Sequence, residues 1–215
     1  MTAKYQLLVH PELRDQLREL HAEAQQNPSG PEAQEFEAVR QGLSVLRDGR
    51  EAEFSGERLG YSDRHADLRD CAEIKLPVVQ EFNRRGRQMG PSHRLTYREF
   101  EGPTPGDLPI RQPIAFEPRK DGRPFEVTAG RLGRTRGVPM SELQSLPNVA
   151  PAIGEAKDAS RPAGPARRAL PADLAQAMKG LEGLSSASGA ATPPIGEHQR
   201  PASRGGPSSG PTRER

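Results

Sequence analysis

The sequence is poor in cysteine and in aromatic residues, and both shortages narrow what the chain can be. Its 215 residues include one cysteine, Cys71, no tryptophan, three tyrosines and six phenylalanines. A single cysteine excludes an internal disulfide framework and a multi-cysteine metal site, and it is typical of a reducing compartment. We therefore expect a cytoplasmic protein that uses no metal and no small-molecule cofactor.

Long apolar runs are also missing from the chain. The N-terminal residues Met1 to Leu8 contain no apolar stretch long enough for a signal peptide, and nowhere do about 18 apolar residues follow one another. We therefore expect neither export nor a membrane partner.

The C-terminal third lacks the bulky side chains that dominate core burial. All nine aromatic residues lie between Tyr5 and Phe125, whereas Pro, Gly and Ser fill 30 of the 79 positions from residue 137 to 215. Such a composition cannot bury enough apolar area to offset the entropy of an ordered chain. We predict a folded domain over residues 1–136 and a disordered tail over 137–215, with one short helix near 172–184.

The charges divide unevenly along the expected domain. Residues 1–83 hold 10 Lys and Arg against 16 Asp and Glu, a net charge of −6. Residues 84–136 hold 12 Lys and Arg against 6 Asp and Glu, a net charge of +6. The division indicates either a basic face that meets a polyanion or an ordinary mixture of surface charges.

The first 50 residues predict a strand followed by a helical hairpin. Tyr5 to Val9 is short and apolar, and Pro11 is suited to the first turn of a helix. Apolar residues then recur every three or four positions in two segments, which are separated by a break at Asn27 to Pro31. The apolar positions are Leu13, Leu17, Leu20 and Ala24, and then Phe36, Val39, Leu43 and Leu46.

Three later segments predict strands, at Cys71 to Val79, His93 to Glu101 and Ile110 to Glu117. In the first two, apolar and charged residues alternate, so that each strand has one apolar face. The apolar positions are Ile74, Leu76, Leu95 and Tyr97; the opposite positions are Glu73, Lys75, Arg94, Thr96 and Arg98. We expect an α+β fold in which the helical hairpin covers the apolar face of a small, mostly antiparallel sheet and the charged face stays open.

Three short motifs within this order of elements resemble the RelE/ParE superfamily of bacterial toxins, and its RelE-like members in particular. Asp70 to Leu76 resembles the family's second strand, and His93 to Arg98 resembles its Arg-Leu-Val-Tyr third strand. Arg119 and Lys120 stand where the family has a Lys-Arg pair. The resemblance covers most of residues 5–134 and is interrupted by an insertion of about a dozen residues, Val78 to Ser92.

The resemblance implies a toxin of a type II toxin-antitoxin system that cuts messenger RNA in the ribosomal A site, where the 2′-hydroxyl attacks the adjacent phosphate. Lys75, Arg94 and Arg119 would hold that phosphate, because cations placed where negative charge develops lower the barrier. Glu73 would act as a general base or form an ion pair with Lys75 or Arg94. Further RNA contacts are expected from Arg98, Lys120 and Arg123. The implied partners are a cognate antitoxin, the ribosome and messenger RNA.

Two residues depart from the family's pattern. Glu73 stands where RelE has a lysine, and Phe125 stands where it has a tyrosine, whose hydroxyl can transfer a proton. His93 is a candidate acid, but its strand parity with Leu95 and Tyr97 predicts a partly buried structural residue. The departures leave two alternatives open. One is a non-catalytic RelE/ParE-fold protein that binds a protein target such as DNA gyrase, and the other is a regulatory nucleic-acid-binding protein.

Overall fold

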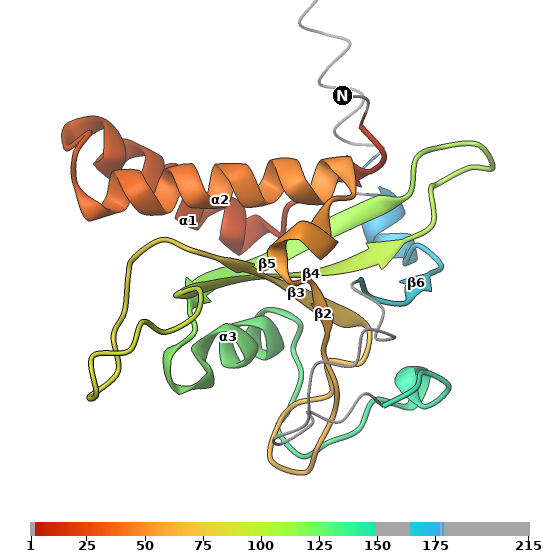
Figure 1. The fold of residues 1–215 in the computed structure, drawn as a ribbon. Helices are drawn as coiled ribbons and strands as arrows, with labels where there is room; N and C mark the ends of the chain where they lie inside the picture. Colours follow the sequence, from red (N-terminus) through yellow and green to blue (C-terminus); the bar gives the residue numbers. More distant parts are fainter. Residues whose placement is uncertain (1–2, 149–163, 177, 179–215) are drawn as a thin grey trace, which may run out of the picture. The chain divides into compact units, whose positions relative to one another are not determined.

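The computed structural model describes residues 3–148, 164–176 and 178, and Figure 1 shows how its elements are arranged. The α-helices are α1 (Pro11–Gln26), α2 (Pro31–Asp48) and α3 (Arg123–Arg131). The strands are β1 (Gln6–Leu7), β2 (Glu57–Arg58), β3 (Cys71–Leu76), β4 (His93–Phe100), β5 (Ile110–Pro118) and β6 (Arg167–Arg168). Three 3₁₀ helices are η1 (Glu51–Phe54), η2 (Lys120–Gly122) and η3 (Ser141–Leu143).

The strands form one mixed sheet, ordered β1-β5-β4-β3-β2. β1 runs parallel to β5, whereas β5, β4, β3 and β2 are antiparallel to their neighbours. β6 pairs parallel to β4, next to the position where β3 begins. The expected α+β class with a mostly antiparallel sheet is confirmed, although β1 is shorter than expected and the sequence pattern does not indicate β2 or β6.

The helices α1 and α2 form a hairpin that covers one face of the sheet (Figure 1). The expected apolar alternation of β3 and β4 faces this hairpin, and its members are fully buried: Ile74, Leu76, Leu95 and Tyr97. They pack against Leu13, Leu20, Val39, Val45 and Leu46 of the helices. At Gly42 the helix α2 approaches the sheet so closely that a Cβ atom would lie 2.8 Å from Leu76 Cδ1 and 3.0 Å from Leu95 Cδ2.

Local signals set the ends of the two helices. Proline occupies the first turn of both, where its missing N–H would be unpaired in any helix. The helix α2 ends at Gly49, whose φ of 68° is the left-handed conformation that glycine adopts most easily. No helix within the described ranges is both long and apolar enough to cross a membrane.

The opposite face of the sheet is also covered, and the expectation of an open charged face is therefore wrong. The helix α3 lies against that face (Figure 1). Thr96 of β4 shares a hydrogen bond of 2.7 Å with Thr128 of α3. A second apolar cluster lies beside it: Leu68, Cys71 and Ile114, with Leu59, Phe125 and Leu132 packed around them. The sequence does not indicate α3, because the helix spans only 9 residues and includes Pro124 and Gly130.

The segment that follows α3 packs against the folded unit, beyond the boundary predicted at residue 136. The described residues up to Met178 form one compact unit. Leu143 is fully buried, and the backbone N–H of Met140 donates a hydrogen bond of 2.9 Å to Asp67 Oδ2. Residues 137–148 therefore pack against the segment that leads into β3.

A second part of the expected tail, residues 164–178, also packs against the sheet. The Glu101 N–H donates a 2.7 Å hydrogen bond to the Arg168 carbonyl beside the β4–β6 pairing. Met178 is 5% exposed and packs against Phe100 and Ile110. Residues 172–176 and 178 are helical, in the region where the sequence predicts a short helix. The rest of the expected tail lies outside the described residues.

Candidate functional site

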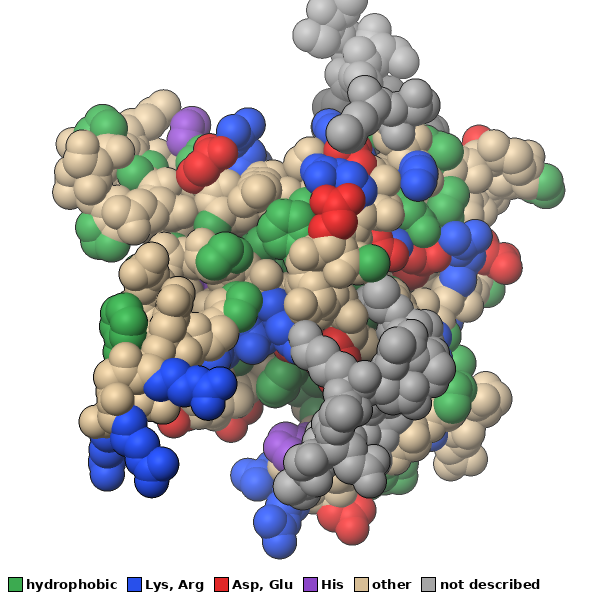
Figure 2. Space-filling model, viewed as in Figure 1, with side chains coloured by type: hydrophobic (Ala, Val, Ile, Leu, Met, Phe, Trp, Pro, Cys, Tyr) green, Lys and Arg blue, Asp and Glu red, His purple; other side chains and the backbone are tan. Residues whose placement is uncertain are grey.

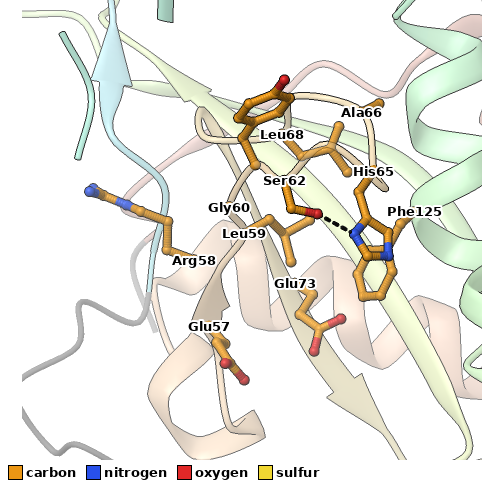
Figure 3. Close-up of a pocket in the computed structure, with 11 residues that line it drawn as sticks. Glu57, Arg58, Leu59, Gly60, Ser62, His65, Ala66, Leu68, Glu73 and Phe125 are labelled. Atoms are coloured by element: carbon orange, nitrogen blue, oxygen red, sulfur yellow. Dashed lines mark hydrogen bonds between the residues drawn. The ribbon is translucent and has the colours of Figure 1, made fainter. Parts of the chain in front are cut away.

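A pocket of about 320 Å³ lies between the segment 57–68, β3 and α3 (Figure 3). Its apolar walls come from Leu59, Ala66, Leu68 and Phe125. Two carboxylates, Glu57 and Glu73, line it as well. Ser62 and His65 are among its other polar lining residues, and Ser62 Oγ shares a hydrogen bond of 2.8 Å with His65 Nδ1. The pocket therefore combines apolar surface with groups that can carry a proton.

Glu73 is the most buried of these polar groups. Its residue is 5% exposed, and its Oε1 atom lies 3.2 Å from Arg94 Nε and 3.6 Å from Lys75 Nζ. Its Oε2 atom is buried without a hydrogen-bond partner. Burial raises the pKa of Glu73 above its usual value, although the positive charges of Arg94 and Lys75 act in the opposite direction. The expected ion pair is confirmed, and one oxygen remains available to accept a proton.

Lys75 and Arg94 lie side by side, because they face each other across the β3–β4 ladder. Lys75 Nζ donates a 2.6 Å hydrogen bond to Glu57 Oε2 of β2. Arg94 Nη1 donates to the carbonyls of Pro91 at 2.8 Å and His93 at 3.0 Å. The side chains of Lys75 and Arg94 are only 15% and 13% exposed. Both cations are thus held in place rather than displayed on an open sheet.

Arg119 lies next to this pair, because its backbone N–H donates a 2.8 Å hydrogen bond to the carbonyl of Ser92, two residues before Arg94. Burial lowers the pKa of Arg94, and the positive charge of Arg119 lowers it further. Arg119 Nη2 itself lies 2.8 Å from Glu81 Oε2, in the segment between β3 and β4. The four residues expected to act on a phosphate therefore form one cluster, in which Glu57, Glu73 and Glu81 balance the three cations. We name Lys75, Arg94, Arg119 and Glu73 the cation cluster.

The three other basic residues expected to contact RNA lie outside the cation cluster. Arg98 donates a 2.7 Å hydrogen bond to Gln112 Oε1, and its guanidinium lies 4.9 Å from the ring centroid of Phe100. Arg123 pairs with Glu117 at 2.6 Å and is exposed. Lys120 is exposed in η2. The expectation that Arg98 shares an open face with Lys75 and Arg94 is wrong, because α3 and its neighbours cover that face.

Arg98 instead lies beside a buried ionic network that holds the fold together. Asp70 is fully buried, and Arg134 Nη1 and Nη2 donate to its two oxygens at 2.6 and 2.8 Å. Arg168 of β6 donates a third hydrogen bond of 2.7 Å to Asp70. Burial alone would raise the pKa of Asp70, but these hydrogen bonds and charges outweigh it and lower the pKa. The network joins the start of β3 to the chain after α3 and to β6.

His93 is a structural residue, as its strand parity predicts. It is 4% exposed, and its ring stacks on Phe116 with 5.1 Å between the centroids. Burial lowers the pKa of His93, so that its neutral form is favoured. A role as the acid of the site is therefore poorly matched to its position in the core.

His65 is the functional candidate that the sequence pattern does not reveal. It lies in the polar segment between β2 and β3, where no periodicity or motif singles out a residue. The fold brings it into the pocket of Glu73 and Phe125 (Figure 3). The only signal in the sequence is the presence of a single histidine in the segment that joins two strands. Within the described part of the chain, no three His, Cys, Asp or Glu side chains are grouped so that they could hold a metal ion.

Comparisons of the chain with protein-family models, with curated proteins and with solved structures found no match. The fold and the site define a class of protein by their geometry: an α+β protein with a buried carboxylate, three clustered cations and an apolar-walled pocket. Any function must be inferred from that geometry and from the motifs of the sequence.

Proposed function

We propose that this chain is a RelE-like toxin that cleaves messenger RNA at the ribosome and is held inactive by a cognate antitoxin. The observation that carries the proposal is the buried carboxylate of Glu73, whose pKa is raised and whose Oε2 atom has no partner. A raised pKa brings a carboxylate nearer to the pH at which it can act as a general base. The adjacent Lys75 and Arg94 supply the positive charge that a phosphoryl-transfer transition state requires.

The reaction that fits these groups is an internal transesterification of RNA. Glu73 accepts the proton of a 2′-hydroxyl, and the 2′-oxygen then attacks the adjacent phosphorus. The bond from phosphorus to the 5′-oxygen breaks, and His65 gives a proton to that leaving oxygen. The products are a 2′,3′-cyclic phosphate and a 5′-hydroxyl. Lys75, Arg94 and Arg119 stabilise the charge that develops on the phosphate oxygens.

The ion pairs of the cation cluster are compatible with a phosphate site. In the free protein, carboxylates of the chain bind the cations, and an RNA phosphate would replace these carboxylates. Glu57 and Glu81 are bound to Lys75 at 2.6 Å and to Arg119 at 2.8 Å. Both carboxylates are more than one third exposed, so that they can be displaced into solvent. A bidentate phosphate contact would then replace a partly solvated ion pair.

A second candidate function is favoured by Phe125. Its ring lines the pocket that contains Glu73 (Figure 3), in the position where the resemblance implies a tyrosine. Phenylalanine has no proton to transfer. The chain would then be a non-catalytic RelE/ParE-fold protein that inhibits a protein target such as DNA gyrase.

Primer extension on messenger RNA from translating ribosomes, after induction of each variant, tests the proposal. We expect Glu73→Gln to reduce cleavage about 10²- to 10⁴-fold, the usual contribution of a general base. Phe125→Tyr should raise cleavage about tenfold or more, because it places a phenol in the same pocket. Glu19→Gln removes an exposed carboxylate of α1 and serves as the matched control, with unchanged cleavage expected.

The two candidate functions give opposite results in this experiment. Growth arrest with intact messenger RNA in the wild type, Glu73→Gln and Phe125→Tyr would exclude the nuclease and favour a protein target. Equal cleavage by the wild type and Glu73→Gln would exclude Glu73 as the base.

A further inference from the structure

The segment between β3 and β4 forms a short arm with a defined conformation. Phe82 and Gln88 form an antiparallel bridge, and the Met89 N–H donates a 2.7 Å hydrogen bond to the Glu81 carbonyl. Asn83 closes the tip, because its Oδ1 atom accepts hydrogen bonds from the backbone N–H groups of Arg85 at 2.9 Å and Arg87 at 3.0 Å. We name residues 78–92 the arm. Its tip is ordered by its own hydrogen bonds.

The base of the arm is attached to the candidate site. Ser92 Oγ accepts hydrogen bonds from the backbone N–H groups of Val78 at 3.2 Å and Val79 at 3.0 Å. Glu81, in the arm, pairs with Arg119 of the cation cluster at 2.8 Å. The arm is therefore held next to the proposed phosphate site at two points.

Unpaired positive charge is concentrated at the tip of the arm. Arg84, Arg85 and Arg87 are exposed, and none of them has a carboxylate partner among the described residues. In Figure 2, Lys and Arg side chains gather where the arm projects at the lower left of Figure 1. In residues 84–136, most arginines of the site and the core are instead paired with carboxylates. Examples are Arg94, Arg111, Arg119 and Arg134.

The arm also exposes apolar side chains that contribute little to the core. Of the five large hydrophobic residues that are exposed in the described chain, three lie in the arm: Val79, Phe82 and Met89. Phe82 is 59% exposed, the highest value among the five. An ordered segment with an exposed aromatic ring among arginines has the composition of a surface that binds single-stranded nucleic acid, because bases stack on aromatic rings and guanidinium groups bind phosphates.

We propose that the arm binds single-stranded RNA, with Arg84, Arg85 and Arg87 on its phosphates and Phe82 stacked on a base. The inference rests on the proposed function only for the choice of RNA as the polyanion. A lipid surface is less well matched, since the arm has one aromatic ring beside three guanidinium groups and no extended apolar face. RNA that follows the arm is led directly to Arg119 and the phosphate site.

Fluorescence anisotropy with a labelled, uncleavable 2′-O-methyl RNA oligonucleotide tests the arm over a range of salt concentrations. The test variant replaces Arg84, Arg85 and Arg87 with Gln. The matched control replaces Arg14, Arg18 and Arg40 of α1 and α2 with Gln, an equal change of charge at exposed positions of the helical hairpin.

The arm variant should bind about tenfold more weakly or worse at 0.1 M salt, because three phosphate contacts are lost. The slope of log K against log salt should become shallower by about 2, since each contact with single-stranded nucleic acid contributes about 0.7. The control should bind within about twofold of the wild type. Phe82→Ala should lower the affinity about tenfold without changing the salt slope, because stacking releases no counterions.

Three outcomes would overturn the inference: equal affinities of the arm variant and the control, no binding of RNA by the wild type, or binding of anionic phospholipid vesicles in preference to RNA. Unchanged thermal midpoints are expected for the arm variant, its control and Phe82→Ala, because their substituted side chains are exposed. Binding that depends on the arm, together with intact messenger RNA in the primer-extension experiment, would contradict the proposed nuclease and leave the arm's role intact.

Discussion

The contribution of the segment 164–178 to stability can be measured directly. The composition of the chain predicts that this segment is disordered and contributes nothing to the free energy of unfolding, whereas the structure packs it against the sheet. Met178 is 5% exposed and packs on Phe100 and Ile110, with Leu170 and Leu174 beside it. The substitution Met178→Ala removes this side chain and leaves a cavity or a collapsed contact. We expect it to destabilise the fold.

The size of the effect follows from the location of the contact. Replacing a buried Met by Ala typically costs about 2–5 kcal/mol. The cluster lies at the edge of the sheet, where neighbours can relax, so we expect about 2 kcal/mol. In a domain of roughly 150–200 residues that corresponds to a fall of about 4–8 °C in Tm. The cost cannot exceed the free energy with which the segment docks, because a destabilised segment can detach from an otherwise intact fold.

Thermal and urea unfolding of three variants measures these quantities. Met178→Ala and a chain ending at residue 163 should both be destabilised, the truncated chain by at least as much as the substitution. A chain ending at residue 184 keeps every described residue and should unfold at the wild-type Tm. If Met178→Ala and the chain ending at residue 163 both unfold like the wild type, the packing of this segment contributes no stability and the reasoning is refuted.

Two further predictions concern residues of the interior. Burial raises the pKa of Glu73, so ionising this residue lowers the stability of the fold. The loss of stability is absent below the unfolded-state pKa and is complete once the pH has risen through the folded-state pKa. Glu73→Gln should therefore raise the Tm at pH 8 and leave it nearly unchanged at pH 4; a fall at pH 8 would identify a stabilising ion pair. Gly42→Val should cost about 1–3 kcal/mol in urea unfolding, because its side chain would overlap Leu76 and Leu95, and a neutral result would show that α2 can shift.

The parts of the fold that the sequence predicts correctly are those with a local period. Leu13, Leu20, Val39 and Leu46 lie at helical spacing, and all four are buried on the side of the helical hairpin that faces the sheet. The alternation of β3 and β4 likewise assigns Ile74, Leu76, Leu95 and Tyr97 to the core. Each of these assignments depends only on residues within one element, so no knowledge of the rest of the chain is needed.

The missed parts depend on contacts between distant segments. β6 is only two residues long, and it pairs with residues of β4 that precede it by 68 positions. The composition of residues 137–215 averages over 79 positions and hides the short apolar segment that ends at Met178. The absence of aromatic residues was misleading for the same reason, because Leu170, Leu174 and Met178 cover Phe100 without a ring of their own.

The candidate site was predictable in part. Strand parity places Glu73, Lys75, Arg94 and Arg98 on one face, and the first three do meet there. Parity could not indicate that α3 covers this face or that a β-bulge between Thr96 and Tyr97 shifts the pairing with β5. Nor could it indicate that His65 reaches the pocket, because that residue lies in a segment without regular structure.

The structure explains the division of charge along the sequence in a way that neither interpretation of the composition includes: it is neither a uniform basic face nor an ordinary mixture of surface charges. The acidic first half and the basic second half are largely paired with each other inside the fold. Among the described residues, five such pairs cross between the halves: Glu12 with Arg131, Glu51 with Arg111, Asp70 with Arg134, Glu73 with Arg94 and Glu81 with Arg119. Much of the net charge of +6 in residues 84–136 is therefore neutralised where it lies.

In residues 84–136, much of the positive charge that remains exposed lies at the tip of the arm, and Lys120 and Arg136 carry the rest of the exposed charge without a carboxylate partner among the described residues. Arg84, Arg85 and Arg87 follow the last acidic residue of the first half, Glu81, and project beyond the network that pairs the others. A uniform basic face would bind a polyanion in many orientations, whereas a charged tip tethered to Arg119 favours one. Under the proposed nuclease function orientation matters, because Glu73 can accept a proton only from the one 2′-hydroxyl that lies beside it.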